Sequence, residues 1–235
     1  MSETKIALVT GANKGIGYEI AAGLLALGWS VGVGARDEDR RETAVAKLGG
    51  KAFGVPLDVT DDASVAAAAR LLERDGLDVL INNAGITGGM PQDPIGADLD
   101  AVRAAVETNV IGVIRVTNAM LPLLRRSASP RIVNMSSTVG SLTRQTAGGD
   151  VGPISVAYAP SKTFLNAVTI QYAKQLRDTN ILINAGCPGY TATDLNGFRG
   201  VRTPEQGAAI AIKLATLPDD GPTGGFFEDA GVVPW

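Results

Sequence analysis

Histidine is absent from this chain of 235 residues. The absence excludes imidazole as a general acid or base, every Ser-His-Asp triad and most zinc sites. Any proton chemistry must therefore come from Asp, Glu, Lys, Tyr or Cys side chains. We expect no metal site.

Cysteine is nearly absent, since Cys187 is the only one. No intramolecular disulfide can form, which favours a reducing compartment. The first residues show no signal-peptide pattern, and no apolar run approaches the roughly 20 residues of a membrane span. The formal net charge is −3, without the basic excess typical of nucleic-acid-binding proteins. We therefore expect a cytoplasmic protein that binds neither nucleic acid nor membranes.

Aromatic residues make up 5% of the chain, whereas glycine occurs 29 times, which favours tight turns and close packing of strands on helices. Short apolar runs, typical of strands in a parallel sheet, occupy 5–10, 29–35, 51–57, 77–82, 131–136, 181–185 and 225–227. Stretches with helical apolar spacing occupy 17–27, 40–48, 64–73, 99–124, 157–176 and 204–217. The alternation predicts one doubly wound α/β domain over 1–235, a Rossmann fold with a parallel sheet of about seven strands.

The first predicted strand ends in a glycine-rich turn, TGANKGIG, which opens the first helix. Gly11 permits the sharp turn, Gly15 leaves room for a pyrophosphate against the backbone, and Gly17 lets the helix pack on the sheet. The helix N-terminus adds free N–H groups and a positive dipole end. This position predicts a dinucleotide site whose first contacts are Thr10, Gly11, Asn13, Lys14, Gly15, Ile16 and Gly17.

The second strand end indicates which dinucleotide binds. NAD sites usually carry an acid there, whereas this chain has Ala35 followed by Arg36. Lys14 is expected to face the same point, and two cations suit the 2′-phosphate of NADP(H). Asp37 follows directly, and the cations could also be solvated surface charges. NADP(H) is favoured, and NAD(H) remains possible.

Two further strand ends supply candidates for the cofactor wall. Asp58 can accept a hydrogen bond from the adenine amino group while Val59 covers the ring, although Asp58 could equally cap the next helix. The fourth strand ends in NNAG, in which small residues leave room for a ribose. From this motif we expect Asn83, Ala84 and Gly85 to line the cofactor.

A tyrosine and a lysine form the candidate reactive pair. Tyr158 and Lys162 are four residues apart, which puts them on one face of a helix. A phenol with a pKa of about 10 needs a shift of roughly three units to exchange protons near neutrality. One cation about 4 Å away could supply most of that shift. Without histidine, Tyr158 is the best acid–base candidate.

Together these motifs resemble the short-chain dehydrogenase/reductase family, in its single-domain branch, over nearly the whole chain. They follow the family's order: the glycine turn, Asp58, Asn82 to Gly85, Asn109, Ser137, Tyr158 with Lys162, and Pro188 with Gly189. The resemblance implies a hydride transfer between a nicotinamide and a carbonyl or alcohol substrate of small size.

The resemblance also implies residue roles. Tyr158 would donate the proton in reduction, Lys162 would lower the pKa of Tyr158 and bind the nicotinamide ribose, and Ser137 rather than Ser136 would bind the substrate oxygen. Asn109 would hold a water in a proton relay with Lys162. The nicotinamide side would be lined by Pro188, Gly189, Thr191 and Thr193.

Two departures from the family pattern bear on the substrate. The stretch from Ser137 to Tyr158 is longer than usual, with the extra length around 144–152, which resembles carbonyl-reductase-like members. The segment 194–203 is short where many members carry a longer lid, so we expect an open, permissive site. The resemblance leaves a homo-oligomer, either dimer or tetramer, and a monomer open.

Three functions remain open at this point. The favoured one is an NADP(H)-dependent carbonyl reductase. An NAD-preferring alcohol dehydrogenase is the second, and Arg36 and Lys14 argue against it. The third is an NADP(H)-sensing regulator without catalysis, which would be expected to have lost a reactive residue.

Overall fold

A computed structural model describes residues 4–89, 92–148 and 153–235. Its strands form one sheet in the order β3-β2-β1-β4-β5-β6-β7-β8. All neighbours are parallel except β7 and β8. The strands are β1 (Ile6–Thr10), β2 (Ser30–Ala35), β3 (Ala52–Pro56), β4 (Val79–Asn82), β5 (Arg131–Met135), β6 (Leu182–Gly186), β7 (Phe226–Glu228) and β8 (Gly231–Val232). The predicted doubly wound α/β fold is confirmed, with one strand more than expected because the chain turns back after β7 as a hairpin.

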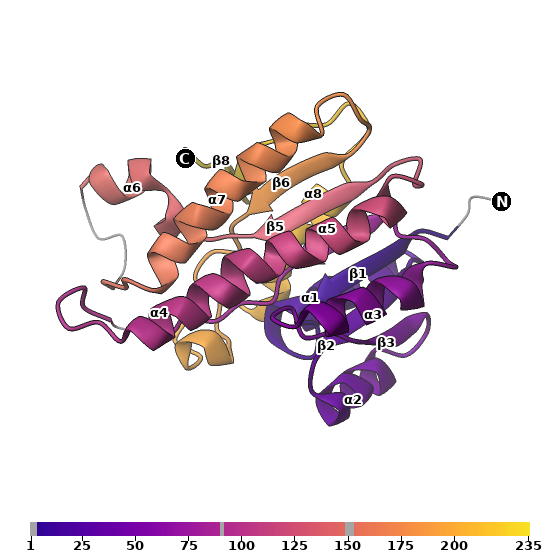
Figure 1. Cartoon of the computed structure of the whole chain (residues 1–235), viewed down its shortest axis with the longest axis horizontal. Helices are drawn as coiled ribbons and strands as arrows, with labels where there is room; N and C mark the ends of the chain where they lie inside the picture. Colours follow the sequence, from indigo (N-terminus) through magenta and orange to yellow (C-terminus); the bar gives the residue numbers. More distant parts are fainter. Residues whose placement is uncertain (1–3, 90–91, 149–152) are drawn as a thin grey trace.

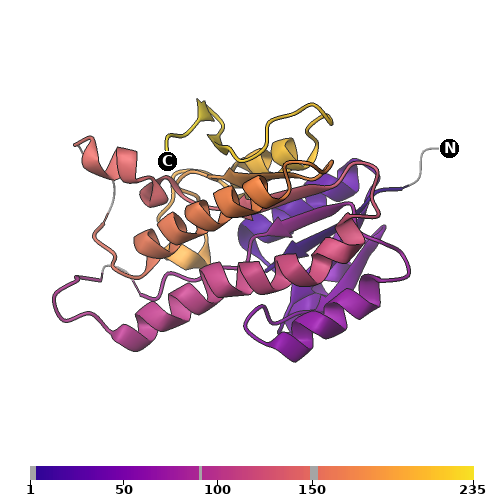
Figure 2. The same cartoon turned by 45° about the horizontal axis from the view of Figure 1, so that its top comes forward.

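Helices cover both faces of the sheet (Figures 1 and 2). They are α1 (Gly15–Ala26), α2 (Glu38–Leu48), α3 (Asp62–Leu72), α4 (Leu99–Val106), α5 (Gly112–Leu124), α6 (Leu142–Thr146), α7 (Tyr158–Gln175) and α8 (Pro204–Ala215). One apolar core joins the sheet to α1, α2 and α8, and a second joins it to α3, α5 and α7. The two-sided burial explains why the strands are apolar on both faces.

The long helix expected over 99–124 is interrupted. A π-helical turn, η1 (Glu107–Ile111), separates α4 from α5. Such turns are rare and often lie at functional sites. Asn109 lies inside this turn and is fully buried. Hydrophobic spacing alone does not distinguish this turn from a continuous helix, because its residues keep nearly helical periodicity.

The described part of the segment between β5 and α7 contains local structure. Ser137 caps a 3₁₀ turn, η2 (Thr138–Gly140), and Ser141 caps the short helix α6. Part of the expected insertion, residues 149–152, lies outside the described residues. The loop after β5 therefore contains two short helical segments instead of running as an irregular turn.

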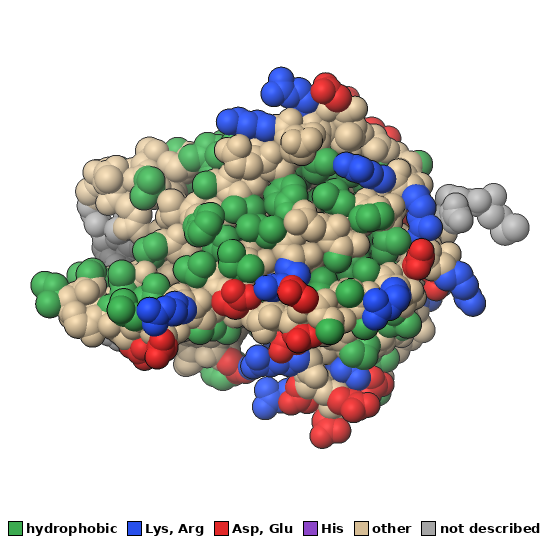
Figure 3. Space-filling model, in the orientation of Figure 1, with side chains coloured by type: hydrophobic (Ala, Val, Ile, Leu, Met, Phe, Trp, Pro, Cys, Tyr) green, Lys and Arg blue, Asp and Glu red, His purple; other side chains and the backbone are tan. Residues whose placement is uncertain are grey.

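The surface of one face divides into an apolar region and a charged region. Figure 3 shows hydrophobic side chains gathered over α5 and α7, while acidic and basic side chains are interspersed over α2 and α3. Within the described part of the chain, no helix combines the length and the apolarity that crossing a membrane requires.

Candidate active site

The glycine turn forms a compact cradle between β1 and α1. A Cβ on Gly17 would lie 2.4 Å from the carbonyl oxygen of Gly11 and 2.5 Å from Nδ2 of Asn83, so only glycine fits there. Gly11 has a positive φ of 65° and lies against Ala84. A Cβ on Gly15, in contrast, would meet only the side chain of Thr193, at 3.4 Å. The cradle is closed towards the sheet and open above Gly15.

The N-terminus of α1 has backbone N–H groups that no described side chain caps. Asp37, Asp61 and Asp98 cap α2, α3 and α4 through their side chains. No described side chain caps the first turn of α1. Free backbone N–H groups at a helix N-terminus, next to a glycine that leaves space, suit the pyrophosphate of a dinucleotide.

Thr10 and Asn83 join the cradle to the loop after β4. Oγ1 of Thr10 accepts hydrogen bonds from the backbone N–H groups of Asn83 and Ala84, at 3.0 and 2.9 Å. Nδ2 of Asn83 donates to the carbonyl oxygens of Thr10 and Gly11, at 2.9 and 3.3 Å. These two side chains hold the loops in place, so their expected part in cofactor binding is indirect.

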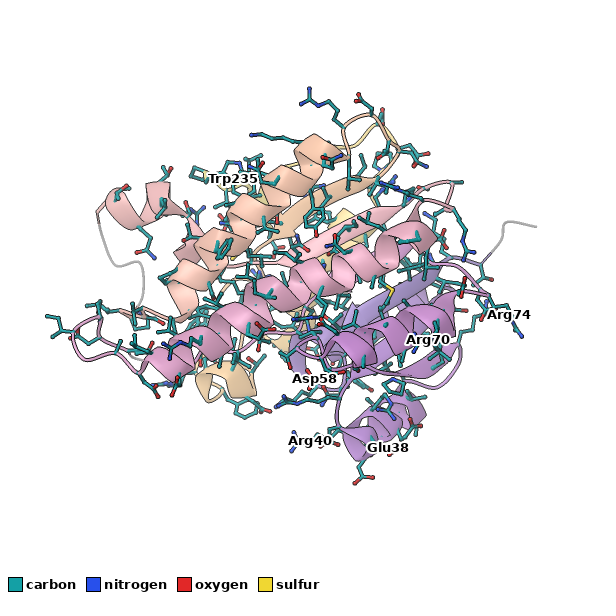
Figure 4. All side chains as sticks on the ribbon, viewed as in Figure 1. Glu38, Arg40, Asp58, Arg70, Arg74 and Trp235 are labelled. Carbon is teal, nitrogen blue, oxygen red and sulfur yellow. The ribbon has the colours of Figure 1, made fainter. Side chains whose placement is uncertain are left out.

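The end of β2 presents a cation and the end of β3 an anion. Arg36 is exposed, and Asp37 is turned away because it caps α2, accepting from the N–H of Arg40 at 2.9 Å. Asp58 accepts bonds from Thr60, which together with Arg36 hold the pKa of its carboxyl below the usual range. Asp61, not Asp58, caps α3, so the helix-cap interpretation of Asp58 was wrong. Asp58 and Arg40 are labelled in Figure 4.

The side chain of Lys14 does not take its expected place. Its ammonium pairs with the carboxylate of Asp194, in the loop after β6, instead of facing the end of β2. The two groups are about half exposed, and the pair spans the open side of the cradle. The physical reason is that the fold brings the carboxylate of Asp194, from a distant part of the sequence, next to the Lys14 ammonium.

Asn109 and Lys162 converge on Gly85. A Cβ on Gly85 would lie 3.2 Å from Oδ1 of Asn109 and 3.7 Å from Nζ of Lys162. Both ends of the Asn109 side chain are engaged: Oδ1 accepts from the N–H of Ile86 at 2.9 Å, and Nδ2 donates to Ile86 and Ser161. The π-helical turn thus uses Asn109 to fix the loop after β4 beside Lys162.

Tyr158 begins α7 and meets Ser137. The Ser137 side chain lies next to the Tyr158 hydroxyl and lowers its pKa. Ser136 points the other way, donating to Oδ1 of Asn166 at 2.6 Å in the buried interior. The role of Ser137 in binding the substrate oxygen stays a prediction. Nζ of Lys162 lies 5.7 Å from the centroid of the Tyr158 ring and donates to the carbonyl oxygen of Met135 at 2.7 Å.

The pKa values differ from the expectation. Burial raises the pKa of Tyr158 to about 12, and the neighbouring Ser137 offsets only part of that shift. Burial also lowers the pKa of Lys162 to about 8. Desolvation is thus the largest influence on both groups, and the expected lowering of the Tyr158 pKa by Lys162 stays a prediction. A neutral phenol at all ordinary pH values suits a proton donor.

Cys187 also lies in this cluster, although the sequence analysis considered it only as a cysteine without a disulfide partner. Its sulfur accepts from the backbone N–H of Thr138 at 3.3 Å and of Gly189 at 3.5 Å. It interacts electrostatically with both Tyr158 and Lys162. The sequence signal that could have placed Cys187 in the site is its position directly after β6 and before Pro188 and Gly189.

The loop after β6 closes the site from the other side. Gly189 has a positive φ of 72° and is exposed. Thr193 faces Gly15, as described above. Thr191 is buried, and its hydroxyl donates to the carbonyl oxygen of Pro188 at 3.1 Å. Thr191 therefore shapes the loop from inside, while Thr193 faces the cradle.

Comparison with known proteins identifies the family. Residues 5–201 match the family model described as short chain dehydrogenase. The chain is a short-chain dehydrogenase. The predicted family and the predicted oxidoreductase class, acting on CH–OH and carbonyl groups, are confirmed.

Relatives of this dehydrogenase include reductases from plants and animals. It is 33% identical to short-chain dehydrogenase/reductase 1 of Saponaria officinalis, covering 100% of this chain and 97% of that protein. It is also 33% identical to carbonyl reductase (NADPH) 1 of Mus musculus, covering 100% and 99%. These alignments run over 300 and 280 positions, more than the 235 residues of the dehydrogenase, so it lacks segments that both relatives have.

Solved structures agree with the fold. The dehydrogenase superposes on NADPH-bound carbonyl reductase from chicken fatty liver with a TM-score of 0.86 at 31% identity, covering 99% of this chain and 100% of that one. Salutaridine reductase from Papaver somniferum gives a TM-score of 0.84 at 30% identity, covering 96% and 99%. The expected likeness to carbonyl reductases is confirmed.

Proposed function

We propose that this dehydrogenase reduces a small-molecule carbonyl to an alcohol with NADPH, using Tyr158 as the proton donor. The observation that carries the proposal is the place of Tyr158, next to the Ser137 side chain and one helical turn from Lys162. A relative named carbonyl reductase (NADPH) and a structural neighbour solved with NADPH support the cofactor and the substrate class.

Four side chains would carry the chemistry. Tyr158 would give its proton to the carbonyl oxygen, and Ser137 would donate a hydrogen bond to the same oxygen, which stabilises the charge that develops there. Lys162 would hold its ammonium next to Tyr158 and Gly85. Asn109 would keep the loop at Ile86 in register with Lys162, and its expected contact with a relay water stays a prediction.

The residues around the cradle would hold the cofactor, which supplies the hydride when bound. The pyrophosphate would bind the N–H groups at the start of α1, above Gly15, with Thr193 on the opposite side. Arg36 would pair with the 2′-phosphate. Asp58 and Val59 would contact the adenine, Ala84 and Gly85 a ribose, and Pro188 and Gly189 the nicotinamide. When the cofactor binds, the Lys14 ammonium would leave the Asp194 carboxylate and pair with a phosphate of the cofactor.

The predicted setting is the cytoplasm, because a single buried thiol gives the chain no disulfide to form. The short segment after β6 and the alignment gaps relative to the plant and mouse relatives support a permissive site.

The test is turnover of NADPH with a panel of aldehydes and ketones. We expect wild-type protein to consume NADPH with several carbonyls, and Tyr158→Phe to lose on the order of 10²- to 10⁴-fold in kcat. Tyr172→Phe is the matched control, since Tyr172 lies on the same helix and bonds Asn118 at 2.7 Å, away from Ser137. NADPH binding without turnover of any carbonyl would instead support a cofactor-sensing protein.

A further inference from the structure

Two adjacent acids at the turn of the β7–β8 hairpin hold two arginines from different parts of the chain. Glu228 is the last residue of β7, and Asp229 follows it in the turn. Glu228 pairs with Arg144, and Asp229 pairs with Arg202. Neither acid belongs to the cofactor cradle or to the cluster around Tyr158.

Arg144 belongs to the segment that leaves β5, which we call the β5 arm (residues 136–147). Its guanidinium makes a two-point contact with Glu228, with Nη2 at 2.5 Å from Oε1 and Nη1 at 3.4 Å from Oε2. A two-point contact fixes the orientation of both planar groups. The arm begins with Ser136 and Ser137, so Glu228 is tied to the segment that carries the partner of Tyr158.

Arg202 belongs to the segment that leaves β6, which we call the β6 arm (residues 187–203). Its Nη2 binds Asp229 and donates to the carbonyl oxygen of Gln206 at 2.7 Å. Its Cδ lies against Gly189, where a Cβ would come within 2.7 Å. Its Nε is buried without a partner among the described residues. Asp229 therefore orients Arg202, the side chain that packs against Gly189.

The β7–β8 hairpin is packed and hydrogen-bonded to neighbouring segments, so it can serve as a fixed attachment point for both arms. Phe226 is fully buried and its ring stacks on Trp235, with centroids 5.5 Å apart. The N–H of Cys187 donates to the carbonyl oxygen of Phe227 at 2.8 Å. Ser141 in the β5 arm donates to the carbonyl oxygen of Pro234 at 2.5 Å. Figure 4 shows Trp235 in the region that Figure 1 labels β8, near α7.

The two arms flank the site because β5 and β6 are neighbouring parallel strands. The β5 arm carries Ser137, and the β6 arm carries Gly189. The arms contact each other where the N–H of Thr138 donates to Cys187. Farther along the chain, both arms are fastened to the same hairpin turn by ion pairs to adjacent acids.

We propose that Glu228 and Asp229 are positioning residues that set the spacing of the two arms, Glu228 for the carbonyl substrate and Asp229 for the nicotinamide end of the cofactor. The proposal rests on the proposed function, since it assigns the β5 arm to the substrate and the β6 arm to the cofactor. Because one arm serves the substrate and the other the cofactor, a change at Glu228 should alter KM for the carbonyl, and a change at Asp229 should alter the Kd for NADPH.

The experiment compares Glu228→Gln with Asp229→Asn in the full chain. NADPH binding is followed by the change in NADPH fluorescence, and kinetics are measured with one small and one bulky carbonyl. We expect Glu228→Gln to raise KM for the bulky carbonyl about three- to fivefold, with the Kd for NADPH unchanged. We expect Asp229→Asn to raise the Kd for NADPH by a similar factor. Reversing one pair, by Arg144→Glu with Glu228→Arg, should restore the KM.

Glu73→Gln and Asp75→Asn are matched controls, since both acids lie at the far end of α3. Equal changes in KM and Kd for both hairpin variants, or changes confined to thermal stability, would overturn the proposal. The NADPH titration distinguishes a failure of the positioning role of the two acids from a failure of the proposed carbonyl reduction. If wild-type protein turned over no carbonyl, the proposed function would fail, while a selective loss of NADPH affinity in Asp229→Asn would still support the cofactor half of this one.

Discussion

Lys162 is 5% exposed, and its ammonium has one described hydrogen-bond partner, the carbonyl oxygen of Met135. Burying a charge with so little compensation costs stability. We predict that Lys162→Met abolishes reduction but raises the free energy of unfolding near neutral pH by about 1–3 kcal/mol. Urea denaturation, run beside an activity assay, measures both effects.

The pH dependence of that gain follows from the pKa of Lys162, about 8 in the folded chain against an ordinary 10.5. Below about 8 the group is charged in both states, so the folded state carries the full cost. Between 8 and 10.5 the folded state has lost the proton and the unfolded state keeps it, so wild-type stability rises with pH. The advantage of Lys162→Met should therefore shrink across this window. Lys174→Met, exposed on the same helix, should show no such trend.

Ser136 and Ser137 are neighbours with opposite surroundings. Ser137→Ala removes the hydroxyl that lies next to Tyr158, so kcat should fall about ten- to a hundredfold with little change in stability. Ser136→Ala leaves Oδ1 of Asn166 unpaired in the interior, so unfolding should become easier by about 1–3 kcal/mol. Thermal melts and initial rates on the two variants measure the separation. A larger loss of rate in Ser136→Ala would contradict the assigned roles.

At the scale of elements, the contact between α1 and the sheet depends on Gly17. The Cβ of alanine at this position would collide with backbone and with the Asn83 amide, which is itself held by two carbonyl groups. Gly17→Ala should destabilise the chain by about 2–3 kcal/mol and weaken NADPH binding, because the N-terminus of α1 must move. Gly23→Ala is the comparison, since its Cβ would meet only the flexible end of Ile212. A denaturant titration distinguishes the two.

Sequence patterns predicted the regular elements because each βα unit repeats one arrangement, an apolar strand followed by an amphipathic helix. The patterns missed η1, α6 and the last strand. The π-helical turn at Asn109 exists because its side chain bonds Ile86, a contact between residues distant in sequence. The helix α6 is five residues long and is fastened by Trp235 and Glu228, which no local pattern reveals.

The candidate site also divides into features that local sequence patterns predict and features that depend on contacts between distant residues. Tyr158 and Lys162 could be placed from sequence because their spacing puts them on one face of a helix, and Ser137 because it follows the end of a strand in a parallel sheet. The pairing of Lys14 with Asp194 could not, because it joins residues 180 positions apart. The direction of the pKa shift of Tyr158 could not either, since it depends on how much water the folded chain excludes.

At the scale of the whole molecule, all eight strands belong to one sheet and every proposed cofactor contact lies at one edge of it. A ligand bound along that edge contacts the loops after β1, β2, β3, β4 and β6 together. Such a ligand stabilises the folded chain as a whole, by RT ln(1 + [L]/Kd), or about 2.7 kcal/mol at a hundredfold excess over Kd. Thermal stability is therefore a measure of cofactor preference that needs no substrate.

We predict that saturating NADPH raises the melting temperature by about 5–10 °C, and that NADH at the same concentration raises it less. The difference arises at the exposed Arg36, which follows the end of β2 where NAD-binding proteins carry an acid. Arg36→Ala should bring the two melting temperatures together by lowering the NADPH value. Arg74→Ala, at an exposed arginine that pairs with Asp75, should leave both shifts unchanged. Equal shifts for NADPH and NADH in the wild-type chain would contradict the preference for the 2′-phosphate and favour an NAD-dependent alcohol dehydrogenase.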